Sequence, residues 1–146
     1  MKKLPKEFYT RDVVTVAKEL LGKYFIKSEK NFDYITKIVE TEAYDGSIDE
    51  AAHTYIGMTE RNKIMFNEGG YLYVYFTYGF HYCANIVTGE KGKGTAVLIR
   101  AVEPIEPIDK MARNRFGRKL KSEKEIFNLT SGPGKVCQAL KIDKKF

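Results

Sequence analysis

Two glutamates near the end of a predicted β-strand are the residues of this chain best suited to chemistry. Residues 38–44 (IVETEAY) favour extended structure, and Asp45-Gly46 is a turn signal that ends the strand. Because side chains alternate along a strand, Glu40 and Glu42 share one face. One of these carboxylates could act as a general base at the mouth of a site, or both could lie on a solvated strand face. The stretch alone leaves both interpretations open.

A second feature is a cluster of aromatic residues. The chain has ten tyrosines, nine phenylalanines and no tryptophan. Five of the tyrosines fall in one short segment: Tyr71, Tyr73, Tyr75, Tyr78 and Tyr82. Aromatic side chains beside basic residues can stack on unpaired bases while the basic residues hold the backbone. A β-sheet core rich in tyrosine would give the same pattern.

Length and composition indicate one folded domain. The 146 residues suffice for one sizeable core, and a hydrophobic content of 43% argues against a disordered chain. No apolar run approaches the roughly 20 residues that span a bilayer. The basic N-terminus lacks the apolar stretch of a signal peptide, so we expect an intracellular protein. The distant Cys83 and Cys137 predict reduced core residues. The net charge of +6 is compatible with a polyanionic partner.

The elements that must position these residues read as a mixed α/β domain around an antiparallel sheet. A helix is expected after Thr10-Arg11-Asp12, capped by Thr10 and ended by Gly22. Further helices are expected near residues 49–53, after Pro107, after Ser122 as a capping box, and over residues 136–140. The expected strands are residues 23–27, 34–42, 71–76, 82–87 and 95–102, the last ending at Pro104. The basic segment 110–121 is a solvated face or a phosphate-contacting flank.

Three motifs in chain order resemble the 3-methyladenine (alkyladenine) DNA glycosylase family. They are Glu42-Ala43-Tyr44, residues 50–53 (EAAH) and residues 73–85 (YVYFTYGFHYCAN). The match continues through Arg61-Asn62, Met65-Phe66, residues 100–104, residues 131–133, Lys135 and residues 137–140, and it covers roughly residues 7 to 146. The resemblance implies a single α+β domain over residues 1–146, with a curved, mostly antiparallel β-sheet flanked by helices and a β-hairpin that inserts into DNA.

The resemblance also implies a reaction, the hydrolysis of the N-glycosidic bond between a damaged purine and its deoxyribose. Such a bond breaks through an oxocarbenium-like transition state, so a carboxylate can deprotonate the attacking water and stabilise the sugar. By resemblance Glu42 is this catalytic residue, and Arg100 helps to hold it and its water. Glu40 has no assigned role and is expected to be structural. A strand-end salt bridge is the alternative for Arg100.

The family's remaining site residues bind the flipped nucleotide. By resemblance Tyr44, His53 and Tyr75 form an aromatic pocket, in which a cationic purine would stack by cation–π attraction. Asn85 crowds the 2-amino group of normal guanine, although a polar edge-strand residue would look the same. Tyr78, at the hairpin tip before Gly79, fills the gap left in the duplex.

We therefore expect a monofunctional DNA glycosylase of base excision repair that leaves an abasic site. It needs no metal and no cofactor, and it acts as a DNA-associated monomer on double-stranded DNA containing damaged purines, without a membrane. Family members continue into a C-terminal segment that has no counterpart before Phe146, so the chain is expected to lack that segment. The alternatives are a catalytically weak lesion-binding or DNA-binding module and, more remotely, an RNA-binding domain. The sequence does not rank alkylated adenine, alkylated guanine, hypoxanthine and ethenoadenine as substrates.

Overall fold

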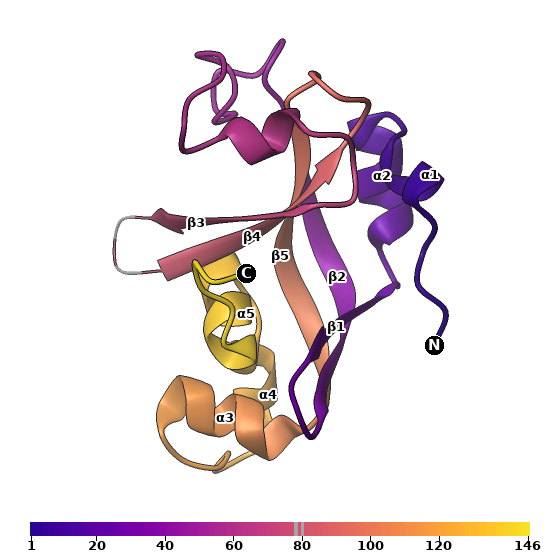
Figure 1. Ribbon diagram of the computed structural model, residues 1–146. Helices are drawn as coiled ribbons and strands as arrows, with labels where there is room; N and C mark the ends of the chain where they lie inside the picture. The colour runs from indigo at the N-terminus through magenta and orange to yellow at the C-terminus, as the bar shows by residue number, and fades with distance from the viewer. Residues whose placement is uncertain (78, 80) are drawn as a thin grey trace. The chain divides into compact units, whose positions relative to one another are not determined.

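The computed structural model describes residues 1–77, 79 and 81–146 (Figure 1). Its strands are β1 (Tyr24–Ser28), β2 (Asp33–Asp45), β3 (Leu72–Thr77), β4 (His81–Thr88) and β5 (Thr95–Glu106). Its helices are α1 (Lys6–Tyr9), α2 (Val13–Leu20), the 3₁₀ helix η1 (Lys63–Phe66), α3 (Ile108–Phe116), α4 (Lys124–Leu129) and α5 (Pro133–Leu140). The predicted wedge residue, Tyr78, lies outside the described residues.

The strands form one antiparallel sheet in the order β1-β2-β5-β4-β3, with β1 and β3 at its ends. The predicted α+β class is therefore confirmed. In the β1–β2 hairpin Tyr24 pairs with Lys37 and Ser28 with Asp33. In the pairing of β4 with β5, Asn85 lies opposite Leu98. The insertion of a hairpin into DNA remains a prediction.

Contacts along the chain group into two compact units, and every strand except β1 has residues in both. The first unit comprises Met1–Glu19, Glu42–Tyr73 and Asn85–Leu98. In it the backbone of Tyr9 lies so close to Gly69 that a Cβ there would overlap the Tyr9 carbonyl. The same carbonyl accepts the backbone N–H of Gly89 at 2.9 Å. Glycine is therefore required at position 69 for close backbone approach.

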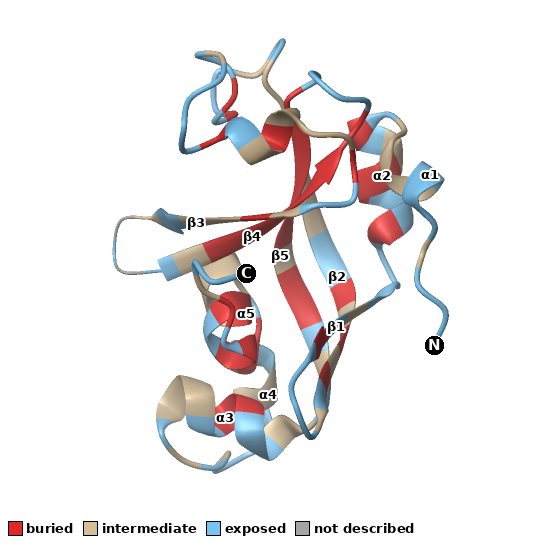
Figure 2. Cartoon of the chain, in the orientation of Figure 1, coloured by how far each residue is buried: buried red, intermediate tan, exposed pale blue. Residues whose placement is uncertain are grey.

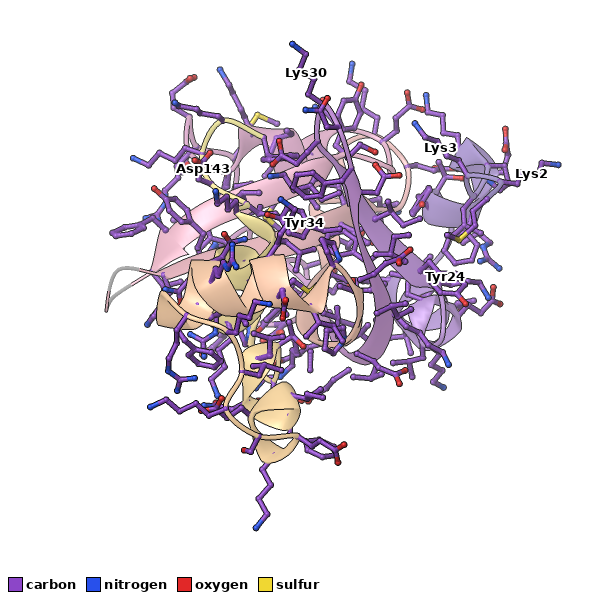
Figure 3. The ribbon with its side chains drawn as sticks, turned by 90° about the horizontal axis from the view of Figure 1, so that it is seen from below. Lys2, Lys3, Tyr24, Lys30, Tyr34 and Asp143 are labelled. Carbon is purple, nitrogen blue, oxygen red and sulfur yellow. The ribbon has the colours of Figure 1, made fainter. Side chains whose placement is uncertain are left out.

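The second unit comprises Leu20–Thr41, Val74–Ala84 and Ile99–Phe146. Tyr34 of β2 is 2% exposed, and its hydroxyl accepts a hydrogen bond from Asn114 Nδ2 at 2.9 Å. Asn114 of α3 also donates to the carbonyl of Ala139 in α5, at 2.7 Å. One asparagine thus joins a strand to two helices. Figure 3 shows Tyr34 inside this unit, whereas Lys30 points outward from the β1–β2 turn.

Most of the buried side chains are aliphatic and lie on β5 and on the inner faces of the helices (Figure 2). Val97, Ile99, Met111, Val136 and Leu140 are completely buried. Both cysteines are free and buried, as predicted. Burial and the neighbouring Cys83 raise the pKa of Cys137 to about 12.

Four local predictions were wrong. Asp12, not Thr10, caps α2, because its Oδ2 accepts the backbone N–H of Thr15 at 3.0 Å. Residues 49–53 form turns rather than a helix, since the Asp49 carboxylate accepts the N–H of Ala51 at 2.9 Å and so competes with helical bonding. The strand predicted to end at Pro104 continues to Glu106. A strand can accept a proline where no ladder N–H is needed.

The fourth wrong prediction is the capping box at Ser122. The N-cap of α4 is Glu123, with no side-chain capping bond. The Glu125 carboxylate instead accepts the N–H of Lys121 at 2.6 Å and pairs with Arg118 at 2.7 Å. The α1 helix was not predicted; its four residues are too few for a periodic apolar pattern.

Candidate active site

The two glutamates lie where one face of β2 emerges from the core. Tyr34, Thr36 and Ile38 on this face are 2% exposed or less. Glu40, the next residue on the face, is exposed, and Glu42 is half-buried. The alternation predicted from the sequence therefore continues along the strand, but this face is buried up to Ile38 and accessible to solvent from Glu40 onward. A carboxylate at such a point is partly shielded and still open to water, as a general base must be.

Tyr44 orients the Glu42 carboxylate. The Tyr44 hydroxyl donates a hydrogen bond to Glu42 Oε1 at 2.9 Å. The two residues are two positions apart on β2, so the strand's pleat itself sets their side chains on the same face. This contact belongs to the first unit, and it joins two of the residues that the resemblance implies are functional.

His53 lies in the loop between β2 and η1, in the same unit. Its Nδ1 is 3.5 Å from the Tyr73 hydroxyl, and the two rings meet edge to face with centroids 6.2 Å apart. Partial burial of the imidazole lowers the pKa of His53, and the positive charge of Arg61 lowers it further. The neutral imidazole is therefore favoured, which leaves one ring nitrogen as a donor and the other as an acceptor.

Asn62 fixes the backbone of this loop, and its role was not predicted. The residue is 3% exposed. Its Nδ2 donates to the carbonyls of His53 at 2.8 Å and Gly57 at 3.0 Å, and its Oδ1 accepts the N–H of Thr59 at 2.7 Å. The signal in the sequence is a threonine three residues before an asparagine that precedes an apolar run, a pattern typical of local side-chain to backbone bonding.

Asn85 and Tyr73 lie side by side on neighbouring strands. Asn85 is 3% exposed, and its Nδ2 donates to the Tyr73 carbonyl at 3.4 Å. Because β4 lies between β5 and β3, Asn85 is not on an edge strand, and that alternative was wrong. Tyr73 is 4% exposed, and burial raises the pKa of its phenol. Tyr73 contacts His53 within this unit; the expected role of Tyr75 beside His53 stays a prediction.

Arg100 and Tyr75 belong to the second unit. Arg100 Nε donates to Glu40 Oε1 at 3.0 Å, with the two side chains 39% and 58% exposed. An ion pair this exposed contributes about 0–1 kcal/mol to stability. Tyr75 is half-buried on β3, and its hydrogen bond to the Cys83 thiol opposes the rise that burial causes in the pKa of Cys83. The ion pair with Arg100 also gives Glu40, which had no predicted role, a cationic partner.

Three of the six basic residues in segment 110–121 make polar contacts within the second unit. Arg115 donates to the carbonyls of Leu129 at 3.1 Å and Asn128 at 3.2 Å, and to Gln138 Oε1 at 2.7 Å. Arg118 forms a bidentate pair with Glu125, which lowers the pKa of that carboxyl to about 2.

Lys119 pairs with Asp109 at 2.9 Å. These three cations hold helices together or neutralise carboxylates. These contacts reduce the positive charge that the segment could offer to DNA phosphates, which weakens the phosphate-contacting alternative.

Among the residues that the structure describes, no group of three or more His, Cys, Asp or Glu side chains could hold a metal ion. In the same part of the chain no helix is long and apolar enough to cross a bilayer.

Comparison with known proteins finds one family throughout the chain. The methylpurine-DNA glycosylase (MPG) family profile matches residues 7–146. A protein of Clostridium novyi, named "Putative 3-methyladenine DNA glycosylase", is 52% identical over 100% of this chain and 74% of its own length. Proteins of the same name from Alkaliphilus oremlandii and Carboxydothermus hydrogenoformans are 50% and 52% identical, each over 97% of this chain and over 72% and 71% of their own lengths.

Proposed function

The chain belongs to the methylpurine-DNA glycosylase family, and from this premise we propose that it is a monofunctional DNA glycosylase of base excision repair. It flips alkylated or deaminated purines out of duplex DNA and hydrolyses the N-glycosidic bond, leaving an abasic site. The single observation that supports this best is the Glu42 carboxylate, half-buried at the end of β2 and hydrogen-bonded by Tyr44.

Glu42 acts as the general base. Its carboxylate takes the proton of the attacking water, and its negative charge stabilises the oxocarbenium character that develops on the sugar. The hydrogen bond from Tyr44 holds one carboxylate oxygen in place, which limits the orientations that the carboxylate can adopt. Arg100 acts as a positioning residue for this centre, a role that family resemblance supports.

Family resemblance supports the binding of the flipped purine by Tyr44, His53 and Tyr75, and the exclusion of normal guanine by Asn85. A purine alkylated at a ring nitrogen such as N3 or N7 is cationic, so aromatic faces attract it and its glycosidic bond is already weakened. The lowered pKa of His53 suits this ligand, because a neutral imidazole does not repel a cationic base. Tyr78 fills the vacated position in the duplex.

The test compares the two glutamates directly. Duplexes containing one hypoxanthine or one alkylated adenine are incubated with the protein and then treated with alkali, which cuts at abasic sites. We expect Glu42→Gln to slow base release about 10²–10⁴-fold, the usual contribution of a general base. Glu40→Gln is the matched control, since it makes the same change two residues earlier on the same face.

Two results would count against the assignment. Equal losses in the two variants, or a larger loss in Glu40→Gln, would remove the special role of Glu42. Binding of the lesion by the wild-type protein without any base release would instead favour a catalytically weak lesion-binding module.

A further inference from the structure

The loop that carries His53 exposes large apolar side chains just beyond it. Tyr55, Ile56 and Met58, here called the apolar tip, are 48%, 82% and 63% exposed. The residues on either side of His53 are buried, Ala52 at 5% and Thr54 at 4%. Figure 2 shows exposed residues over most of this loop. Clustered exposed apolar side chains mark interaction sites more often than single ones do.

The apolar tip stands on a constrained backbone. Gly57 has φ +90°, a conformation that favours glycine, and its N–H donates to the Thr54 carbonyl at 2.9 Å. Thr54 Oγ1 donates to the Gly94 carbonyl at 2.5 Å, and Asn62 bonds the carbonyl of Gly57. A Cβ at Gly46 would overlap the Thr54 side chain, so the base of the loop is closely packed. The tip is therefore preorganised, which reduces the entropy cost of binding.

The chemistry of the loop fits the apolar surfaces of DNA, its sugars and unstacked bases, rather than the phosphates. The tip itself has no charge, and the exposed Arg61 lies three residues beyond it. Duplex DNA offers apolar surface at its sugars, and flipping a nucleotide exposes further base faces that apolar side chains can cover. The tip shares its backbone clamp with His53, since Asn62 bonds the carbonyls of both His53 and Gly57.

Resting on the proposed function, we propose that the apolar tip is a second DNA-contacting element, separate from Tyr78. It packs against the sugar and unstacked base surfaces beside the flipped nucleotide. Because its contacts are apolar, it releases no counterions and adds affinity that salt does not screen. It therefore binds DNA containing an unstacked site better than intact duplex.

The test uses the full chain and a fluorescein-labelled duplex containing a tetrahydrofuran abasic-site analogue, with anisotropy as the readout. The variant is Ile56→Ser combined with Met58→Ser. The matched control is Phe127→Ser, because Phe127 is 84% exposed on α4, away from this loop in sequence and in the other unit. Circular dichroism melts check that each variant folds.

We expect the tip variant to raise Kd about tenfold, which corresponds to about 1.4 kcal/mol, while Phe127→Ser matches the wild type. The slope of log Kd against log salt concentration should stay unchanged, because no phosphate contact is lost. On intact duplex the tip variant should lose less than threefold, about 0.7 kcal/mol.

Three results would overturn the inference. They are an unchanged Kd, a lower salt slope, which would indicate phosphate contacts, and reduced self-association in sedimentation with unaltered DNA binding. The proposed function is checked separately by base release from wild-type protein. If the wild type releases hypoxanthine and the tip variant binds the duplex with the wild-type Kd, only this inference fails. If the wild type neither binds the duplex nor releases hypoxanthine, the proposed function fails.

Discussion

Replacing Asn62 by alanine would test whether one buried side chain orders the loop that carries His53. The substitution removes three hydrogen bonds to backbone groups, those to the His53 carbonyl, the Gly57 carbonyl and the Thr59 N–H. Each neutral hydrogen bond contributes about 1 kcal/mol net, which gives about 3 kcal/mol for the side chain. Water can reach part of the opened loop and replace some bonds, so about 2 kcal/mol is the lower bound.

Native-state hydrogen exchange measures this effect where it occurs. The amides of Tyr55 and Gly57 donate to carbonyls inside the loop, at 3.0 and 2.9 Å. We expect their protection to fall about 30- to 150-fold in Asn62→Ala, which corresponds to about 2–3 kcal/mol of local stability. Amides of β1, which belongs entirely to the other unit, should keep their protection.

Two further variants isolate the cause. Asn31→Ala makes the same replacement at an exposed position in the β1–β2 turn and should change nothing in the loop. Asn62→Asp keeps the size and the acceptor for Thr59 but loses both donors, and it points a carboxylate at two carbonyls. It should lose at least as much protection as alanine. Wild-type protection in Asn62→Asp would refute the reasoning, because it would show that the two donated bonds contribute nothing.

The strand β2 shows what the alternation rule can and cannot predict. It correctly places Glu40 and Glu42 on one face, because period 2 is a property of the backbone. It cannot distinguish them, since the difference lies in their partners. Tyr44 bonds Glu42 from two residues away, whereas the partner of Glu40 is Arg100, sixty residues later. The first contact is local and could have been predicted; the second depends on the order of strands in the sheet.

The segment 110–121 illustrates a second limit. Composition alone predicts a basic surface, and the sequence left its purpose open. In the structure Arg115 bonds backbone carbonyls at the end of α4 and a side chain of α5. Backbone carbonyls carry no sequence signature, so no charge pattern could have revealed these acceptors. By contrast, the Arg118–Glu125 pair joins residues seven positions apart, and opposite charges at that distance were visible in the sequence.

The loop at 46–62 was the least predictable part of the candidate site. The side chains of Asp49, Thr59 and Asn62 accept hydrogen bonds from nearby backbone N–H groups in it, and such bonding competes with regular structure. The apolar pattern that identifies helices and strands is therefore absent from it. Family resemblance supplied His53, but Tyr73 and Asn62, which contact it, became visible only once β3 and the loop were placed.

Two further predictions concern His53 and the basic helix. Because the pKa of His53 is lowered from 6.5 in the folded protein, the unfolded chain binds more protons, and stability should fall as pH drops below about 6.5. With only two histidines in the chain, NMR titration can follow His53 directly; Arg61→Gln should raise its pKa, and an unchanged value would exclude the Arg61 charge as a cause. For α3, Arg115→Ala should lower the free energy of unfolding in urea by about 2–3 kcal/mol, because three acceptors lose a charged donor. Arg113→Ala, which removes an exposed arginine from the same helix, should change it by less than about 0.5 kcal/mol. If this segment contacts phosphates, Arg113→Ala should still reduce the salt slope of DNA binding by about 0.9. Equal stability losses in the two variants would mean that the bonds of Arg115 do not hold α4 and α5 to α3.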